Sequence, residues 1–196
     1  MIAELNGTRQ LVAATRDALV GIDLASGAKL WQRDVQTFRG MNILTPTIWN
    51  QQIFSSSYGG RSQAFTVRAV APGQWTTEDV WQGKSEAYMS SPVVVGDHAY
   101  LHLKNKRVCC IDLKTGSETW RTQPFGGYWS MVTDGERILA LDELGKLLLL
   151  AANPTKFELL DEVTVSDEPC WAHVAIADNE VFVRSQRGLK RFQFAE

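Results

Sequence analysis

The chain has 196 residues, of which 44% are hydrophobic and 21% are charged, and its formal net charge is −2. These are ordinary values for a globular chain. They show no basic excess of the kind that marks a nucleic-acid surface, and no apolar run reaches the roughly 20 residues that a membrane-spanning helix needs. Three cysteines without a Cys-x-x-Cys motif do not predict a disulfide framework. We expect one sizeable core or two small ones, with no nucleic-acid partner and no membrane span.

One motif occurs twice and organises the sequence. Residues 21–31 read Gly-Ile-Asp-Leu-Ala-Ser-Gly-Ala-Lys-Leu-Trp, and residues 110–120 read Cys-Ile-Asp-Leu-Lys-Thr-Gly-Ser-Glu-Thr-Trp. The Asp can accept hydrogen bonds from the turn that follows it, and the Gly supplies a positive φ. Alternating apolar residues on either side predict two strands. The shared positions are Asp23, Gly27 and Trp31 in the first copy, and Asp112, Gly116 and Trp120 in the second.

Turn signals recur about every forty residues along the chain. Three turns per unit would connect four short strands, which is the antiparallel meander of a propeller blade. A helix is the alternative over residues 143–152, but Gly145 and the Asn153-Pro154 turn favour a buried strand. Trp81 holds the position of the repeated Trp in the second unit, and Leu160 holds it in the fourth. We predict five blades in a single propeller domain, the last without its outer strand, at residues 1–35, 44–82, 89–123, 129–165 and 170–196.

The Asp-x-x-(Thr/Ser)-Gly-x-x-x-Trp motif, the Ser-Ser-Pro-Val-Val sequence at residues 90–94 and the period resemble the quinoprotein-like β-propellers, which are built from PQQ-binding-like repeats. The resemblance covers essentially the whole chain. It implies four-stranded antiparallel blades, in which Trp31, Trp81 and Trp120 dock onto the neighbouring blade. The resemblance to this family also implies a periplasmic or cell-envelope location. Rings of this family usually have more than the five blades predicted here. We therefore expect the missing blades to come from a longer chain or from a second copy of this chain. The remaining alternative is that five blades close into a tight ring.

Few residues point to catalysis or metal binding. Cys109-Cys110 is similar to a vicinal disulfide of some quinoprotein dehydrogenases, but neighbours on a strand point to opposite faces, which favours two buried structural cysteines. His98 and His102 would lie about 13 Å apart along a strand, too far to share a metal, and we interpret them as surface or channel residues. Asn6-Gly7-Thr8 fits both a glycosylation acceptor and a hairpin turn, and the turn is favoured. We predict no catalytic residue and no metal ligand.

A set of aromatic residues with one cation is the candidate binding surface. The loops that enter the first strand of each propeller blade form one rim of the central channel, where segments 39–42, 87–91, 126–129 and 169–173 would meet. Aromatic and Arg residues are enriched in binding hot spots. One interpretation is a rim that binds a protein, peptide or glycan, and the other is packing between blades. The residues are Arg39, Tyr88, Tyr128, Trp129 and Trp171.

Two functions are consistent with the predicted propeller. The favoured one is a non-catalytic scaffold without a cofactor that presents its rim to a partner. The alternative is part of a quinone-dependent dehydrogenase, which would need pyrroloquinoline quinone (PQQ), a calcium-type cation held by oxygen ligands and a carboxylate base. No position of the sequence matches the family's catalytic Asp or its metal ligands, which favours the scaffold.

Overall fold

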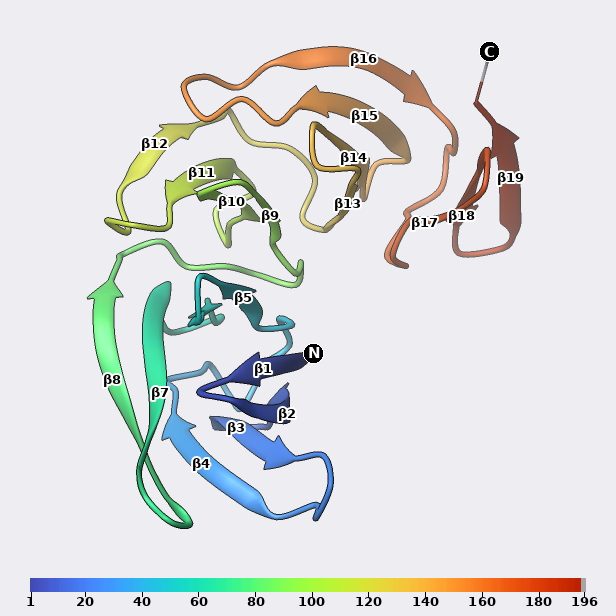
Figure 1. Ribbon diagram of the computed structural model, residues 1–196. Helices are drawn as coiled ribbons and strands as arrows, with labels where there is room; N and C mark the ends of the chain where they lie inside the picture. Colours follow the sequence, from blue (N-terminus) through green and yellow to red (C-terminus); the bar gives the residue numbers. More distant parts are fainter. Residues whose placement is uncertain (195–196) are drawn as a thin grey trace. The chain divides into compact units, whose positions relative to one another are not determined.

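The computed structural model describes residues 1–194, which form five antiparallel β-sheets (Figure 1). Four sheets have four strands and the last has three, and each keeps its strands in chain order. We number these sheets as blades one to five along the chain. No helix occurs among residues 1–194, and β15 (Lys146–Ala151) occupies the segment for which a helix was the alternative. The predicted all-β fold of four-stranded antiparallel blades with an incomplete last blade is therefore confirmed.

The chain divides into two compact units. The first comprises Met1–Tyr88 together with the turn Asp112–Ser117, and it contains the first two blades. Blade one consists of β1 (Ile2–Leu5), β2 (Thr8–Ala14), β3 (Ala18–Asp23) and β4 (Lys29–Asp34). Blade two consists of β5 (Thr47–Trp49), β6 (Gln52–Ser55), β7 (Gln63–Ala71) and β8 (Gln74–Gln82). The prediction of a single propeller domain stays a prediction.

The second unit comprises Met89–Ile111 and the chain from Glu118 onward, and it contains the remaining blades. Blade three consists of β9 (Val93–Val95), β10 (His98–His102), β11 (Val108–Asp112) and β12 (Glu118–Arg121). Blade four consists of β13 (Trp129–Thr133), β14 (Arg137–Asp142), β15 and β16 (Leu159–Thr164). Blade five consists of β17 (Ala175–Ala177), β18 (Glu180–Arg184) and β19 (Leu189–Gln193).

The repeated Asp and Gly build the same turn in blades one and three. Asp23 Oδ1 accepts hydrogen bonds from the backbone N–H and the hydroxyl of Ser26, both at 2.7 Å. These bonds, the hydroxyl bond first, lower the pKa of Asp23. Gly27 and Gly116 have φ values of 72° and 75°, and each donates its N–H to the carbonyl of its turn's Asp at 2.8 Å. The motif thus acts through backbone geometry, as the sequence indicated.

A β-bulge recurs at the same place in every four-stranded blade. It shifts the pairing of the third and fourth strands at Gly21/Ile22, Ala64/Phe65, Cys110/Ile111 and Leu149/Leu150. In blades one to three, the residue just before the shift pairs with Trp31, Trp81 or Trp120. Because a bulge bends the strand and redirects its side chains, this irregularity aims each indole away from its own sheet.

Blade four has no indole at this position. Leu149 pairs with Asp161, and Leu160 is the residue bulged out of the ladder. The prediction that Leu160 holds the Trp position was therefore wrong. It rested on apolar character, whereas the strand pairing places a carboxylate there. The outer strand β16 is exposed along its whole length.

Trp31 seals the space between blades one and two. Its ring meets Phe65 of β7 edge to face, with centroids 5.9 Å apart, and it is only 3% exposed. The buried Gln10 side chain accepts the indole N–H at 2.6 Å. Gly21 lies directly beneath the ring, where a β-carbon would overlap the indole. A buried polar N–H needs such a partner, so Gln10 and Gly21 together make room for the indole and satisfy it.

The other two repeated tryptophans dock on turns instead. In the first unit, Trp81 donates its indole N–H to the carbonyl of Leu113 at 2.7 Å and covers Gly116. In the second unit, Trp120 donates to the carbonyl of Asn153 at 2.8 Å. Each of these indoles therefore leaves its own sheet and binds the turn between the last two strands of the next blade.

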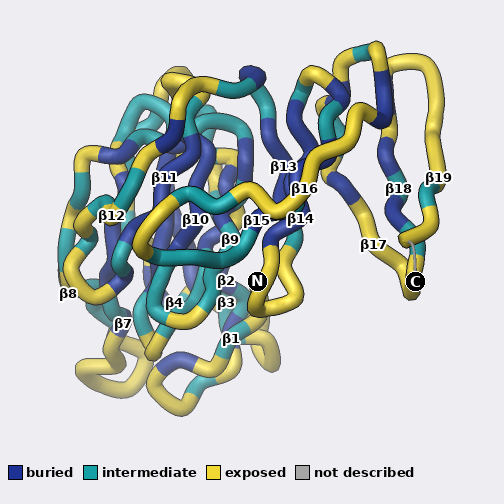
Figure 2. The backbone as a smooth tube through the Cα atoms, turned by 90° about the horizontal axis from the view of Figure 1, so that it is seen from above, coloured by how far each residue is buried: buried dark blue, intermediate teal, exposed yellow. Residues whose placement is uncertain are grey.

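The hydrophobic core lies between successive sheets. Within the first unit, one buried cluster joins blades one and two, with Leu5, Leu19, Trp31, Ile53 and Phe65 among its members. Within the second unit, one cluster joins blades three and four, and another joins blades four and five. Figure 2 shows the same pattern, with burial along the middle strands and exposure along β16, β17 and β19. Inter-sheet packing is what stabilises each small sheet.

We predict that Gly116→Ala destabilises the protein more than Gly27→Ala. Both residues have a positive φ, so either substitution costs about 1–2 kcal/mol of backbone strain. Only at Gly116 would the new β-carbon overlap the Trp81 ring, because nothing lies within 4 Å of the corresponding point at Gly27. We expect an additional loss of about 1–3 kcal/mol from overpacking, measured as the free energy of urea unfolding. Equal losses for the two variants would show that Trp81 does not press on this turn.

Candidate functional site

Tyr128 and Trp171 come together at the surface of the second unit. Tyr128 directly precedes β13, and Trp171 lies in the segment that leads from β16 into β17. Their ring centroids are 5.8 Å apart, with planes inclined at 53°. Trp171 is 60% exposed. We call this pair, together with Glu143, the second aromatic cluster.

Glu143 holds both parts of this cluster in place. Its Oε1 accepts the indole N–H of Trp171 at 2.9 Å, and its Oε2 accepts the backbone N–H of Gly127 at 2.6 Å. Its backbone N–H donates to the Tyr128 carbonyl at 2.8 Å, and its carbonyl accepts the Cys170 N–H at 2.9 Å. Glu143, which directly follows β14, therefore connects the loop before β13 with the segment between β16 and β17. An exposed Trp with so many constraints behind it is held in one orientation.

A hollow of about 430 Å³ opens beside Trp171. Arg184, at the end of β18, is exposed and contributes a cation to this hollow. The lining thus combines an indole face with a guanidinium group. It is formed by Pro169, Trp171, Ala172, Arg184, Ser185 and Gln186.

The first unit carries a comparable group, which we call the first aromatic cluster: Phe38, Arg39, Tyr58 and Tyr88. The ring of Tyr58 lies 5.1 Å from that of Phe38 and 5.1 Å from that of Tyr88. The Arg39 guanidinium lies 5.1 Å from the centre of the Phe38 ring, within the range of a cation–π contact. Glu86 accepts the Gly59 N–H at 2.6 Å and so ties the loop of Tyr58 to the segment before Tyr88.

Trp129 does not belong to the candidate surface. It is 3% exposed, and its indole N–H donates to the buried Asp142 carboxylate at 2.6 Å. Its ring stacks on His102, with centroids 5.8 Å apart and planes inclined at 9°. The prediction that Trp129 contributes to a binding rim is therefore wrong, because the first residue of β13 points into the core. For this residue the structure shows the other interpretation, packing between blades.

His102 is also part of the core. It is fully buried, and its Nε2 hydrogen-bonds the Gly126 carbonyl at 3.1 Å. Burial lowers its pKa to about 4, although the Gly126 carbonyl and the carboxylates of Asp142 and Glu143 act in the opposite direction. The interpretation of His102 as a surface or channel residue was wrong, because β10 is a middle strand whose residues are covered on both faces.

Several residues of the two clusters were missed from the sequence. Phe38 directly precedes the predicted rim segment 39–42, whereas Tyr58 lies far from every predicted rim segment in the sequence. Glu86, Glu143 and Arg184 have no sequence signal that separates them from solvated charged residues near turns. Their roles come from contacts between loops that are distant in the sequence.

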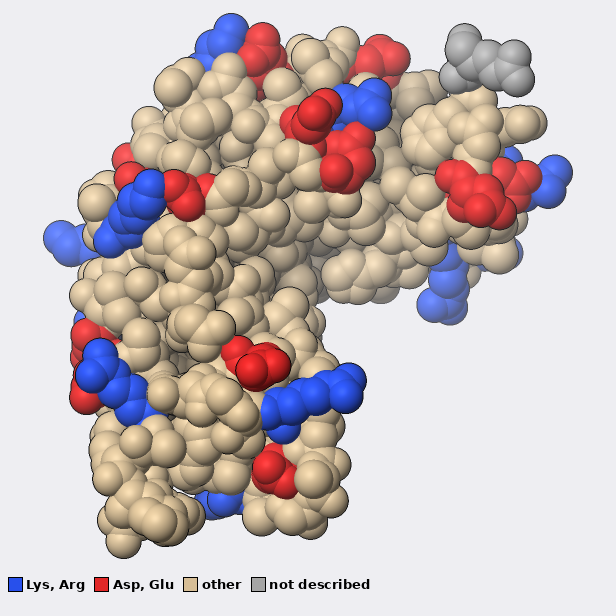
Figure 3. All heavy atoms as spheres, viewed as in Figure 1, with Lys and Arg blue, Asp and Glu red and all other residues tan. Residues whose placement is uncertain are grey.

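The described part of the chain contains no group of three or more His, Cys, Asp or Glu residues placed to hold a metal ion. Cys109, Cys110 and Cys170 are buried and none of them forms a disulfide, as the sequence predicted for the first two. None of the described residues belongs to a helix that could cross a membrane. On the face in Figure 3, acidic and basic side chains are interspersed over both units. The expected absence of a cofactor stays a prediction.

The fold and its repeated turn, bulge and tryptophan define a β-propeller of the PQQ-like repeat class. Residues 2–122 match the family model described as outer membrane protein assembly factor BamB, and the chain belongs to this family. None of the curated proteins matches its sequence.

Solved structures support the fold along nearly the whole chain. BamB from Moraxella catarrhalis matches with a TM-score of 0.71 and 18% identity, covering 98% of this chain and 56% of that one. The β-propeller domain of Cps50 (Swd1) from Myceliophteria thermophila matches at 0.68 and 14%, covering 94% and 66%. The computationally designed Ika8 protein matches at 0.62 and 12%, covering 98% and 57%. The chain thus spans little more than half the length of the Moraxella protein and of Ika8.

We predict that acidification destabilises the protein through His102. The unfolded residue takes up a proton near its ordinary pKa of 6.5, whereas the folded residue does so only at about 4. Stability is therefore lost as the pH falls from about 6.5 to 4, by up to about 3 kcal/mol.

Urea unfolding at several pH values tests this. His102→Gln keeps a donor for the Gly126 carbonyl but cannot be protonated, so we expect the loss of stability in this pH range to shrink markedly in the variant. The same pH slope in both proteins would assign the acid sensitivity to other groups.

Proposed function

We propose that this chain is a non-catalytic protein-binding module of an envelope complex that assembles outer membrane proteins, and that both aromatic clusters contact its protein partner. The family match over residues 2–122 supports the assembly role and a periplasmic or envelope location. The observation that carries the binding role is Trp171, a 60% exposed indole held from behind by Glu143. Large exposed apolar side chains that are rigidly held are typical of interface anchors.

The geometry favours recognition over chemistry. The two carboxylate oxygens of Glu143 already accept hydrogen bonds from Trp171 and Gly127, so this residue orients the site. Glu86 holds the loop of Gly59 in the first cluster in the same way. Ordering these loops before binding reduces the entropy that a partner must overcome.

The charges indicate what the partner presents. Arg39 accompanies the aromatic rings of the first cluster, and Arg184 lies in the hollow beside Trp171. A protein segment that combines carboxylates with apolar side chains matches both surfaces. Aromatic rings also suit a peptide or glycan, but the assembly role of the family favours a protein.

Site-specific photo-crosslinking in the producing bacterium tests this function. A photoreactive residue at Tyr88 or Trp171 is expected to capture the same partner protein, one involved in outer membrane assembly. Val70, which is 63% exposed on the hairpin between β7 and β8, is the matched control and should capture none. Capture at Val70 alone, or of proteins unrelated to the envelope at all positions, would contradict the proposal.

We predict that Trp171→Ala weakens binding of that partner at least tenfold, because a central aromatic anchor contributes about 2 kcal/mol or more. The free energy of unfolding should change by less than about 0.5 kcal/mol, since the side chain is largely exposed. Calorimetric titration and urea unfolding measure the two effects separately. Unchanged affinity would exclude the second aromatic cluster from the interface.

A further inference from the structure

A small polar cleft lies between blades one and two of the first unit, where both sheets have their four strands. The end of β4, the loop between β6 and β7, the first residue of β7 and the last residue of β8 form its walls. Its volume is about 140 Å³. These walls differ from the residues of the first aromatic cluster. The polar lining includes Arg33, Asp34, Ser57, Arg61, Gln63 and Gln82.

The charge of Arg33 is compensated within the protein. Its guanidinium forms an ion pair with Asp79 and donates two hydrogen bonds to Gln63 Oε1, from Nε at 3.2 Å and from Nη2 at 2.9 Å. Gln63 is only 7% exposed. Because an Arg side chain can only donate, the carboxamide oxygen of Gln63 faces it. The NH₂ group of Gln63 is thereby left as a donor for the cleft that this residue lines.

Arg61 contributes a second cation, whose charge is not compensated. Its Nη1 donates to Gln82 Oε1 at 2.8 Å, and Gln82 Nε2 donates in turn to Asp79 Oδ2 at 3.0 Å. These bonds fix the Arg61 side chain through a neutral amide. Within the described chain Arg61 forms no ion pair, so its remaining guanidinium N–H groups can donate to a ligand.

An uncompensated carboxylate lies on the blade-one side of the same cleft. Asp34 is the last residue of β4 and is exposed. Its Oδ1 accepts a hydrogen bond from the Gln32 side chain at 3.0 Å, and it forms no ion pair with any cation among residues 1–194. Asp34 and Arg61 thus line one cleft from different blades without pairing with each other.

Backbone packing fixes the spacing of the two walls. The Ser57 hydroxyl donates to the Gln36 carbonyl at 2.7 Å. A β-carbon at Gly60 would lie 2.3 Å from the same carbonyl oxygen. The loop that precedes Arg61 therefore packs directly against the segment that follows Asp34. Walls that are ordered before a ligand arrives reduce the entropic cost of binding it.

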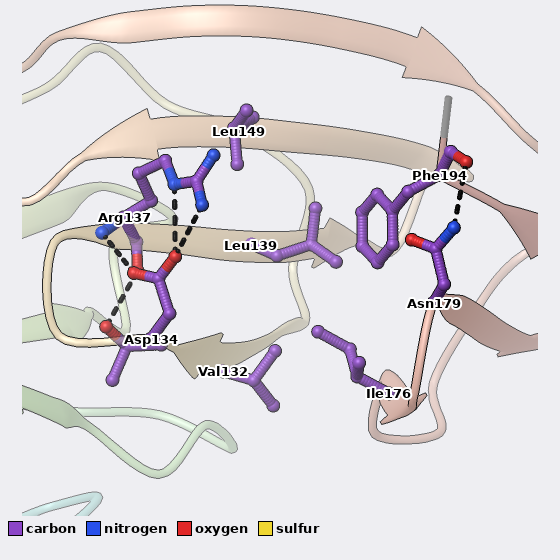
Figure 4. A pocket seen from close by; sticks show the side chains of 9 residues that line it. Val132, Asp134, Arg137, Leu139, Leu149, Ile176, Asn179 and Phe194 are labelled. Carbon is purple, nitrogen blue, oxygen red and sulfur yellow. Dashed lines mark hydrogen bonds and ion pairs between the residues drawn. The ribbon is translucent and has the colours of Figure 1, made fainter. Parts of the chain in front are cut away.

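A cavity in the second unit shows the alternative, in which opposite charges pair with each other. Asp134 and Arg137 both line the cavity in Figure 4, and their side chains form an ion pair at 2.9 Å. Each of these two charges is already compensated by the other. In the cleft between blades one and two, by contrast, one charge of each sign remains available to a ligand.

We propose that this cleft binds a small zwitterion of the α-amino acid type. The carboxylate of the ligand accepts hydrogen bonds from Arg61 and from the NH₂ group of Gln63, and its ammonium group donates to Asp34. A simple anion would leave Asp34 uncompensated, and an uncharged sugar would leave both charges so. The volume is well below the roughly 300 Å³ or more of sites for drug-sized ligands, which suits a small amino acid.

Titration with alanine tests the requirement for both ligand charges. We expect alanine to shift the NMR signals of the Arg61 Nε–H and the Gln63 side-chain amide. Alaninamide lacks the carboxylate and N-acetylalanine lacks the ammonium group. Each should bind about tenfold or more weakly than alanine, because each loses a hydrogen bond between charged groups.

Variants of the two charged residues make the test specific. Arg61→Gln and Asp34→Asn should each weaken alanine binding about tenfold or more, measured by calorimetry. Both residues are exposed, so their unfolding midpoints should match that of the parent protein. Arg9→Gln is the matched control, because Arg9 is an exposed residue of the same unit outside the cleft, and its affinity for alanine should be unchanged.

Three results would overturn the proposal. The first is the absence of any signal shift at Arg61 and Gln63 with alanine at tens of millimolar. The second is equal binding of alanine and alaninamide, or affinities that Arg61→Gln and Asp34→Asn leave unchanged. The third is binding of inorganic phosphate or glucose in place of alanine, which would assign the cleft to a simple anion or to a sugar.

Discussion

The contact between a tryptophan on one sheet and the blade that follows is the interaction on which this structure depends. Each sheet has at most four short strands and cannot bury an adequate core alone. The buried clusters accordingly join residues of successive blades within each unit. The bulge before each repeated tryptophan directs the indole outward, and a turn or an aromatic ring of the next blade receives it. Repeating this contact builds a core from sheets that are individually too small.

The indole N–H has the same requirement in every environment. Trp31 donates to a buried amide, Trp81 and Trp120 to backbone carbonyls, and Trp129 to a buried carboxylate. Trp171 donates to Glu143 in the same way, yet its ring remains largely uncovered. Trp171 thus makes the same kind of indole hydrogen bond as the tryptophans between blades, but its ring lies at the surface. This contrast is the physical basis for the binding role that we propose for the second aromatic cluster.

The sequence predicted the fold well because its signals are local. The Asp and Gly of each turn act within a few residues, so their spacing carries the geometry directly. No sequence signal marks the bulge. The apolar character of Leu160 therefore favours it for the Trp position, whereas the strand pairing places Asp161 there. Similarly, Trp129 and Trp171 look alike in the sequence, and only the pairing of β13 with β14 separates a core residue from a surface one. Glu86 and Glu143 act between loops that the sequence gives no reason to associate.

A double-mutant cycle on Trp31 and Phe65 tests the inter-blade contact most directly. The two residues come from different blades and meet edge to face at 5.9 Å. Equilibrium unfolding of Trp31→Leu, Phe65→Leu and the double variant gives their coupling free energy. The structure predicts a favourable coupling of about 0.5–1.5 kcal/mol, as expected for an aromatic pair. A coupling of zero, with the two losses strictly additive, would contradict the claim that the tryptophan holds one blade to the next.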